Sequence, residues 1–478
     1  MQTNSNARRW AALPVLLAGA FMVVLDFFIV NVALPSMAAD LEASASSLEW
    51  VVAGYGLTFA VFLITAGRLG DDIGRRRVYA IGLGLFTLAS LACGLAPSAA
   101  TLVLARVAQG VAAAVLMPQV LSIIGVAYRG PDYVRALSVY GVVLGLAAVG
   151  GQLVGGALVE SDVAGLGWRW CFLINVPVGL AALVLTPVLV PESQAESRSR
   201  LDLAGAVMVA AGLVAVLLPL IEGRAQGWPA WTWISLAAAP FILAAFVLHQ
   251  RALTRRGAAP LLDLGLFGQR GFSGGLATQL LLASAQAAFF VYLALYLQMG
   301  RGLDPLESGL VFTILAVSYV AVSGPAPKLT ERYGRAVIAA GGLCLAAGLG
   351  SLALAVAEVG VDGSLAAFVP GLLLAGAGVG LCFTPLTAIV LGNIDPERAG
   401  AASGVLSTTQ QVGYSLGVAI TGVIFFGAGN DIARAFELSL IELAVLAAGV
   451  AVASRLLPGA GRAPRPQTPP PVSQEAAY

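Results

Sequence analysis

The segment Gly67-Arg-Leu-Gly-Asp-Asp-Ile-Gly74-Arg-Arg-Arg77 follows the second apolar stretch of the sequence, and Pro327-Lys-Leu-Thr-Glu-Arg-Tyr-Gly334-Arg335 follows the tenth. The last glycines of the two segments lie 260 residues apart. With these glycines aligned, a leucine, an acidic residue and an arginine recur in step. A second pair, Arg135-Ala136 and Arg398-Ala399, recurs at an offset of 263 residues. The repetition indicates that the chain consists of two similar halves.

The composition places both halves in a membrane. Hydrophobic residues make up 59% of the 478 residues and charged residues only 11%, whereas a soluble domain has about 25% charged residues. Since a membrane helix needs about 20 apolar residues, we expect an all-α membrane protein with about 14 transmembrane helices. The expected spans lie near residues 11–35, 48–66, 78–97, 100–125, 135–158, 169–190, 203–221, 231–249, 271–298, 306–324, 336–357, 366–390, 399–427 and 434–456.

The offset of the repeat also predicts how the spans are grouped. It is longer than six spans require, and the seventh and eighth spans account for the difference. We therefore expect two six-helix halves with two extra helices between them. The expected parts are a cytoplasmic N-terminus (1–10), an N-terminal half (11–190), the extra helices (191–257), a C-terminal half (258–457) and a disordered cytoplasmic tail (458–478). Parallel repeats of this kind are typical of secondary transporters, whose substrate site lies between the halves near the middle of the membrane.

Basic residues predict the orientation, because cytoplasmic segments are enriched in them. If the N-terminus is cytoplasmic, Arg106 lies inside a span and only Arg169, Arg224, Arg301 and Arg434 fall in outer segments, out of 26 lysines and arginines. Adding or removing one span would invert every later connection and destroy this bias. We expect a multi-pass protein of the cell membrane with both termini in the cytoplasm.

Several classes of function lack the residues that they need. A net charge of +1 gives no reason to expect a nucleic-acid partner. Lys328 is the only lysine and follows a proline, so no phosphate-binding loop for ATP is expected. A single histidine, His249, and four cysteines within apolar runs argue against a metal site or disulfides. We expect no catalytic residue and no cofactor, and an ion gradient or downhill passage as the energy source.

Three charged residues are candidates for proton coupling: Asp26, Arg106 and Glu49. Asp26 lies inside the first span, where a charge costs about 2.5–3.5 kcal/mol and usually faces a functional interior. Because burial favours the neutral acid, we expect Asp26 to exchange protons; a structural hydrogen bond is the alternative. Arg106, in the fourth span, either modulates this acid, relays protons or locks two helices together. Glu49 lies near a span end, where its side chain can also reach water.

Polar side chains inside the spans are candidates to line a substrate site. Amide and phenol groups can hydrogen-bond a substrate, but they equally join helices to one another. The candidates are Asn31, Tyr55, Gln109, Gln279, Gln286 and Tyr292. Gln286 lies 260 residues after Asp26, so the second half has a polar group that cannot titrate at the matching position.

Together these segments resemble the major facilitator superfamily, and specifically its fourteen-helix drug:proton antiporter family. The segment beginning at Gly67 resembles the cytoplasmic-loop signature, which clamps the two halves and gates their alternation. The resemblance implies gating roles for Gly67, Gly70, Asp71, Gly74, Arg75 and Arg76. Three further segments resemble signatures of the same branch. The first-helix signature is matched by Leu25-Asp26 through Asn31-Val-Ala-Leu-Pro35, and the fourth-helix signature by Arg106 with Gln109-Gly110. The signature at the start of the sixth helix is matched by Trp168-Arg-Trp170-Cys-Phe-Leu-Ile-Asn175-Val-Pro177.

The fifth span resembles the antiporter signature, whose glycines make a close and pliable helix contact. The resemblance implies a hinge helix with Gly145, Gly151, Gln152, Gly155 and Gly156, where Gln152 stands in place of the usual proline. It further implies a proton-coupled antiporter in the lipid bilayer that exports small amphipathic drugs or antibiotics by alternating access. The alternatives are a dedicated exporter of one metabolite or lipid-like product, a solute importer, and a non-transporting membrane receptor.

Overall fold

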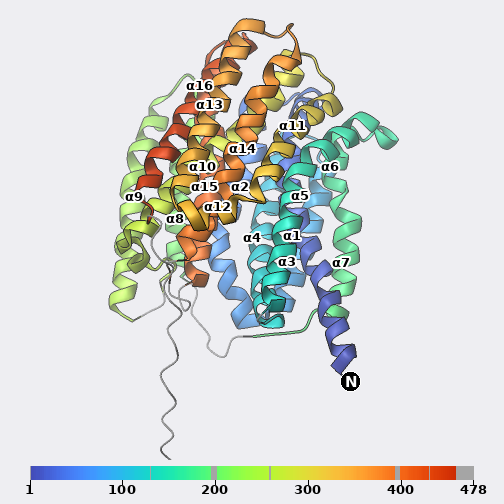
Figure 1. The fold of residues 1–478 in the computed structure, drawn as a ribbon, viewed down its shortest axis with the longest axis vertical. Coiled ribbons are helices and arrows are strands. Elements are labelled where there is room, and N and C mark those ends of the chain that lie inside the picture. The colour runs from blue at the N-terminus through green and yellow to red at the C-terminus, as the bar shows by residue number, and fades with distance from the viewer. Residues whose placement is uncertain are drawn as a thin grey trace, which may run out of the picture.

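A computed structural model describes residues 2–129, 131–194, 202–257, 260–392, 394, 399–429 and 431–458 of the chain. These residues form helices and connections, without a strand among them. Figure 1 shows most of the long helices side by side in one bundle. The helices are α1 (Gln2–Asp40), α2 (Ala45–Ile73), α3 (Arg75–Gly94), α4 (Ala99–Ala127), α5 (Pro131–Ser161), α6 (Trp170–Leu173), α7 (Asn175–Leu189), α8 (Leu203–Ala225), α9 (Ala230–Arg255), α10 (Arg270–Leu295), α11 (Pro305–Ser323), α12 (Ala326–Tyr333), α13 (Ala336–Val359), α14 (Val369–Leu391), α15 (Ala399–Gly427) and α16 (Ile432–Ala453).

The number of long helices is compatible with the fourteen expected spans. Within the described residues, twelve helices are long and apolar enough to cross a membrane, and α5 is a thirteenth if its two parts, bent by 42°, form one span. Helix α15 has 29 residues, which at 1.5 Å per residue is also long enough to cross. Its first half is rich in serine, threonine and glutamine, so its composition is less apolar than that of the other spans.

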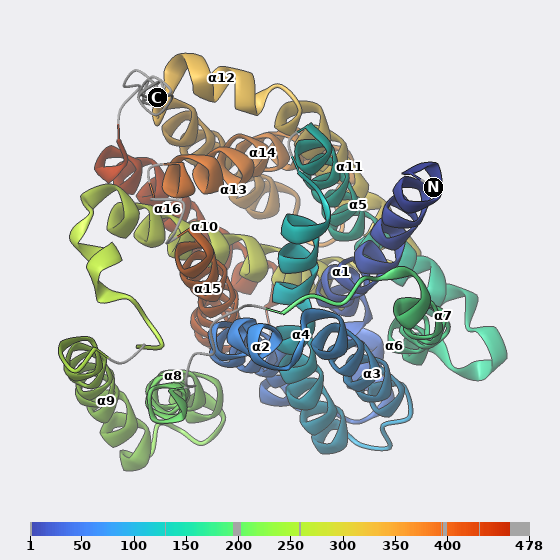
Figure 2. The same cartoon turned by 90° about the horizontal axis from the view of Figure 1, so that it is seen from below.

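The helices pack in two groups with a hairpin beside them. Helices α1–α7 pack on one another, as do α10–α16. The two groups meet along a seam formed by α2 with α15, α5 with α11, and α1 with α10. The extra pair, α8 and α9, is connected to this seam by α8, which contacts both α2 and α15. Figure 2 shows α9 outermost, on the far side of α8 from the two groups.

Several helix starts are fixed by polar caps that the sequence encodes locally. Ser44 accepts a hydrogen bond from the Ser47 amide at the start of α2, and Asp304 and Glu307 form a reciprocal capping box at the start of α11. Such caps satisfy amides that have no partner within the helix. They also fix where each connection turns.

The segment expected to be a loop after the second span is helical, which corrects the expectation. Helix α2 continues through Gly67 and Gly70 to Ile73, and only Gly74 separates it from α3. A Cβ atom at Gly70 would lie 1.9 Å from the Gln119 side chain on α4. Gly70 therefore permits close helix packing rather than ending the helix. The matching segment in the second half is also largely helical, as α12.

The seam is packed at one end of the bundle. We name the end that contains Gly74 the Gly74 end, and the opposite end, where α2 begins, the Glu49 end. In the second half of α5, a Cβ at Gly155 would lie 2.7 Å from Ile29 on α1, and one at Gly156 would lie 2.3 Å from the Pro305 carbonyl at the start of α11. In the first half of α5, no described atom lies within 4 Å of such a Cβ at Gly145. At the Glu49 end, α5 therefore meets α11 of the other group closely at Gly156, whereas Gly145, nearer the Gly74 end, faces no described atom.

Candidate functional site

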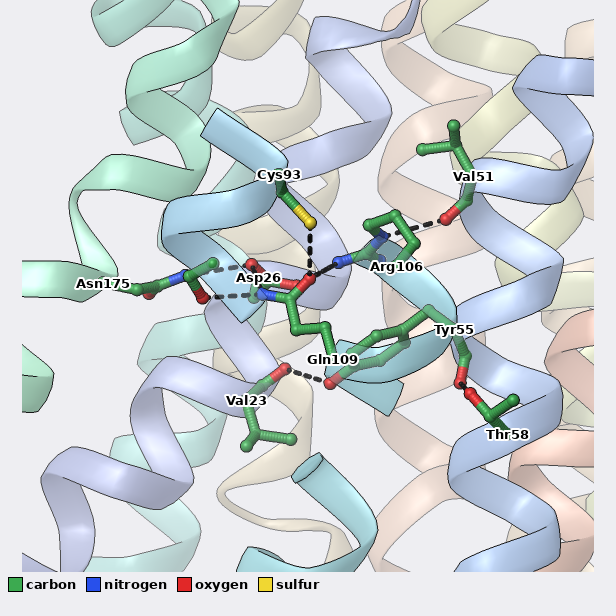
Figure 3. A network of polar contacts seen from close by, with 10 residues as sticks. Val23, Asp26, Val51, Tyr55, Thr58, Cys93, Arg106, Gln109 and Asn175 are labelled. Carbon is green, nitrogen blue, oxygen red and sulfur yellow. Dashed lines mark hydrogen bonds and ion pairs between the residues drawn. The ribbon is translucent and has the colours of Figure 1, made fainter. Parts of the chain in front are cut away.

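A buried charge network forms around Asp26 on α1. Asp26 and Arg106 on α4 are both 0% exposed, and an Arg106 Nη1 group donates to Asp26 Oδ2. The other carboxylate oxygen accepts from the Gln109 amide at 2.8 Å and from the Asn175 amide at 2.9 Å. Figure 3 shows these side chains converging on Asp26 from α1, α4 and α7. Each oxygen of this carboxylate therefore has a hydrogen-bond partner.

A second layer of bonds holds the partners of Asp26 in place. The Gln109 amide also donates to Ser90 Oγ on α3 at 2.8 Å, and Arg106 Nε donates to the Val51 carbonyl on α2 at 2.9 Å. The Cys93 thiol lies 3.5 Å from the Gln109 carbonyl oxygen. All of these groups belong to the first helix group. The network therefore moves as one body when the two groups move relative to each other.

Burial makes this network costly to disrupt. Removing charges from water costs several kcal/mol per ion, and good geometry with further hydrogen bonds is needed to offset that cost. The bonds to Asp26 meet this requirement. Replacing only one member of such a pair leaves an uncompensated buried charge, which typically destabilises a protein by about 3–5 kcal/mol.

Aromatic rings connect the network to the seam. The Arg106 guanidinium lies over the Tyr55 ring, 4.2 Å from its centroid. The Tyr55 ring contacts Phe27, with centroids 6.1 Å apart, and Phe27 stacks on Tyr414 of α15 at 4.7 Å. Phe28 makes a second contact across the seam, to Phe290 on α10 at 5.4 Å. The charge pair is thus linked by ring contacts to both helix groups.

The residues expected to line a substrate site occupy different settings. Gln109 is part of the Asp26 network, and the Tyr55 hydroxyl donates to the Val23 carbonyl within the first group. Tyr292 donates to the Val418 carbonyl within the second group. Gln279 is buried on α10. The hydroxyls of Tyr55 and Tyr292 therefore join helices within one group.

Two of the expected lining residues retain unused acceptors. The side-chain oxygens of Asn31 on α1 and Gln286 on α10 are buried and accept no hydrogen bond from described groups. Gln152 on α5 is 1% exposed, and neither the nitrogen nor the oxygen of its side-chain amide has a hydrogen-bond partner among the described residues. These amides lie on three helices that form the seam.

The turn at the Gly74 end is organised by a residue that sequence reasoning missed, Glu192. Gly74 has φ of 115°, a backbone conformation that glycine adopts readily. A carboxylate oxygen of Glu192, after α7, accepts from the Arg76 amide at 3.0 Å, and Arg76 Nε lies 3.5 Å from the other oxygen. The backbone amide of Arg75 donates to the Ser193 carbonyl. The side chain of Asp71 lies outside the described residues, so its expected gating role stays a prediction.

The hinge glycines divide along α5. Gly151 and Gly155 pack against Phe28 and Ile29 of α1, within the first group, and Gly156 makes the seam contact with α11 described above. Gly145 lies in open space among the described atoms. The close helix contact expected from these glycines is therefore present in the second half of α5.

A second buried acid, Glu49, lies at the start of α2 and is 3% exposed. Arg224, at the end of α8, is its counter-ion, with Nη2 3.7 Å from Glu49 Oε1. Arg224 was missed as a site residue because the sequence shows it only as a basic residue in an outer segment. Ser90 and Asn175 were missed as members of the Asp26 network. A serine and an asparagine inside apolar runs were the available signal.

Two packed groups of membrane helices, with a sealed charge pair in one of them, define a multi-pass membrane transporter. The model of the Major Facilitator Superfamily matches residues 16–418, and the chain belongs to this superfamily. This confirms the resemblance found in the sequence.

Relatives of the chain are named for the export of antibiotics and drugs. The chain is 38% identical to a probable actinorhodin transporter of Streptomyces coelicolor, over 88% of this chain and 73% of that protein. It is 34% identical to the cephamycin export protein CmcT of Amycolatopsis lactamdurans, over 97% of this chain and 96% of that protein. It is 36% identical to the multidrug resistance protein Stp of Mycobacterium tuberculosis, over 85% of this chain and 74% of that protein.

Solved structures share the fold at low sequence identity. A POT family transporter in complex with 5-aminolevulinic acid matches with a TM-score of 0.68 and 14% identity, covering 92% of this chain and 94% of that chain. A bacterial homologue of the human lysosomal transporter Spinster, in an inward-facing and unoccupied conformation, matches with a TM-score of 0.65 and 17% identity, covering 94% and 98%. These likenesses concern the fold alone.

Proposed function

We propose that this protein exports small amphipathic drugs or antibiotics across the cell membrane in exchange for protons. The names of its relatives support drug export as the function. The observation that carries the coupling is the Asp26–Arg106 pair, which is fully buried and linked by aromatic rings to the seam. The protein would perform no covalent chemistry and use no ATP or cofactor.

The seam between the two groups supports alternating access as the transport mechanism. Because α5 meets α11 closely at Gly156 near the Glu49 end, whereas Gly145 faces no described atom, we assign the structure to a state closed at the Glu49 end. In the orientation expected from the basic residues, the Gly74 end faces the cytoplasm, together with both termini. A drug would enter from there and bind between the groups, against the rings of Phe27 and Tyr414 and the side-chain oxygen of Gln286, which accepts no hydrogen bond from described groups. An apolar site with a few amides suits weakly charged, amphipathic molecules.

Proton coupling would act through the pairing of Asp26 with Arg106. A proton on Asp26 removes the negative charge that Arg106 faces, so the guanidinium is held less strongly. Since Arg106 lies over Tyr55, its movement would change the ring contacts at the seam. If proton binding and drug binding favour different states, each lowers the affinity for the other by the same factor.

The test is efflux from an efflux-deficient bacterium that expresses the protein. Fluorescent dyes and antibiotics are followed with and without a protonophore, for wild type and Asp26→Asn. We expect protonophore-sensitive efflux in wild type and none in the variant. Glu160→Gln, an exposed acid at the end of α5, is the matched control and should behave as wild type. Equal active efflux by Asp26→Asn, at equal membrane abundance, would refute the coupling role.

A dedicated exporter of one compound is the second candidate, because relatives such as the actinorhodin and cephamycin proteins are named for single products. A broad compound panel separates the two functions. Efflux of many unrelated amphipathic compounds supports multidrug export. Efflux of one chemical series alone supports the dedicated exporter.

A further inference from the structure

Glu49 has an unusual environment for a carboxylate inside a membrane protein. Among the described residues, no group donates a hydrogen bond to either of its oxygens, and the nearest cation, Arg224, stands 3.7 Å away. Arg224 Nη2 is itself a buried donor without a hydrogen-bond acceptor among those residues. This pair therefore lacks the bonds that offset the burial of charge.

Three separate bodies meet at this carboxylate. Glu49 belongs to α2 of the first group, and Arg224 belongs to α8 of the extra pair. On the second group, a Cβ atom at Gly422 of α15 would lie 2.7 Å from the Glu49 carboxyl carbon and 2.6 Å from the Tyr292 hydroxyl. We call these four residues the Glu49 junction. The Glu49 carboxylate therefore lies at the seam, in close contact with α15 of the second group.

The other charged groups around the junction come from α8 and α16. Glu222 of α8 accepts a hydrogen bond from the Trp50 indole at 3.0 Å, which gives α8 a second bond to α2. The Arg224 guanidinium also lies 4.8 Å from the centre of the Phe426 ring. Glu442 of α16 accepts a hydrogen bond at 2.9 Å from the hydroxyl of Thr421, the residue before Gly422. Arg224 is the only basic residue that the structure places beside Glu49 among the described residues.

Alternating access gives Glu49 two environments. With the Glu49 end closed, the carboxylate is buried and needs either a proton or a counter-charge. With that end open, α2 separates from α15 and the carboxylate meets water, which solvates its charge. Asp26 differs, because all its partners lie in the first group and stay with it in both states.

We propose that Glu49 is a proton-binding site of the seam, and that Arg224 of the extra helix pair competes with the proton for it. A proton on Glu49 favours the closed end. Arg224 lets the end stay closed when Glu49 is ionised, by supplying the positive charge in place of the proton. The inference rests on the proposed alternating access, and it gives the extra helices a part in that cycle.

The test is a measurement of seam opening that does not depend on transport. Ala53 on α2 is 0% exposed and packs with Leu217 and Ile221 of α8 and Ala419 of α15, so Ala53→Cys places a thiol at the same three-body contact. The half-buried Cys344 is replaced by serine, and the three fully buried native cysteines are retained. The parent without Ala53→Cys gives the background. Maleimide labelling of the purified protein in nanodiscs, between pH 5 and 8, reports opening, after correction for the change in thiol reactivity with pH.

In the Ala53→Cys background, adding Arg224→Gln should make maleimide labelling at pH 8 roughly tenfold faster, which is within the usual range of coupling energies. At pH 5 the labelling rate should return to that of Ala53→Cys alone. That return on acidification also shows that the variant is folded. Adding Glu49→Gln to it should give slow labelling at every pH, because position 49 then carries neither a charge nor a titrating group.

Arg434→Gln is the matched control. It removes the arginine of an exposed pair with Glu437 near the same end, on α16, and should not change labelling. Fast labelling of Arg224→Gln at every pH would overturn the proposal, and so would pH-dependent labelling that persists in the double variant. Because labelling needs neither drug nor gradient, these results stand apart from the efflux test of the proposed function.

Discussion

Asp26 and Glu49 are both carboxylates buried in the first helix group, and each faces an arginine. Asp26 has hydrogen bonds from Arg106, Gln109 and Asn175, whereas Glu49 accepts none from the described residues. The partners of Asp26 all belong to its own group, but Arg224 comes from the extra helices and the Glu49 carboxylate rests on α15.

The difference shows that burial alone does not determine what an acid in a membrane protein does. A carboxylate with a full set of bonds inside one rigid group is a stable charge centre that can act through its counter-ion. A carboxylate without hydrogen bonds, at a contact between moving groups, is sensitive to whether that contact is open. The same residue type therefore suits a coupling centre in one place and a gate in the other.

The largest expected effect distinguishes the two arginines. Arg106→Gln leaves the Asp26 charge buried without its counter-ion, so we expect a loss of about 3–5 kcal/mol of stability. Arg224→Gln should cost much less, because the Glu49 end can open and let water reach the carboxylate. Thermal unfolding of both variants in the same lipid nanodiscs compares them directly.

The control for this comparison is the double variant Asp26→Asn/Arg106→Gln. It removes both charges at once, so it should recover a large part of the stability lost in Arg106→Gln while efflux stays absent. A melting temperature of Arg224→Gln as low as that of Arg106→Gln would contradict the distinction between the two sites.

A second prediction separates charge from packing at the closed end. A Cβ at Gly156 would lie 2.3 Å from the Pro305 carbonyl, so Gly156→Ala must push α5 and α11 apart. Overpacking of this kind costs about 1–3 kcal/mol. We expect faster labelling of Ala53→Cys at every pH, because no titrating group is involved, and reduced efflux.

Gly145→Ala, in the same helix, is the matched control for that substitution. The added methyl group meets no described atom, and alanine is favoured over glycine within a helix. We expect wild-type labelling and unchanged or slightly higher stability. A pH-dependent effect of Gly156→Ala would show that packing and the Glu49 junction are not separate.

Much of the fold could be predicted from the sequence because lipid imposes local rules. Apolar length predicted the spans, and the repeated loop segments predicted two similar halves. Asp26 and Arg106 stood out because each is costly in a membrane whatever surrounds it. The error at Gly67–Ile73 arose because glycines were interpreted as loop residues, although in membrane helices they permit close packing.

The partners of these charged residues could not be predicted in the same way. Ser90 and Asn175 meet Asp26 only because α3 and α7 pack against α1 and α4. Arg224 meets Glu49 from a helix that the repeat marks as extra, so no pattern in either half points to it. A sequence shows which groups need a partner in lipid, whereas the packing of distant segments determines which partner they find.

The smallest expected effect concerns a third acid, Asp202, which has a full set of bonds like Asp26 but lies at the start of α8, outside the spans. Its carboxylate accepts from the Gly205 amide at 2.8 Å and from Gln250 at 2.7 Å, and His249 Nε2 lies 3.0 Å away. Burial by itself would raise the pKa of Asp202, but these hydrogen bonds outweigh it and hold the pKa below its usual value.

A lowered pKa means that the ionised form of Asp202 stabilises the fold above the unfolded-state pKa, near 3.9, and that this contribution is lost as the pH falls through the native value. We expect Asp202→Ala to cost about 1 kcal/mol, as for other helix caps, with a constant difference in melting temperature from pH 8 to 5. The difference should shrink below about pH 4. Ser98→Ala, which removes a neutral cap of α4, should lose a similar amount at every pH. A constant difference for Asp202→Ala down to pH 3 would show that its charge contributes nothing, and that a full set of bonds matters for Asp26 but not at the helix end.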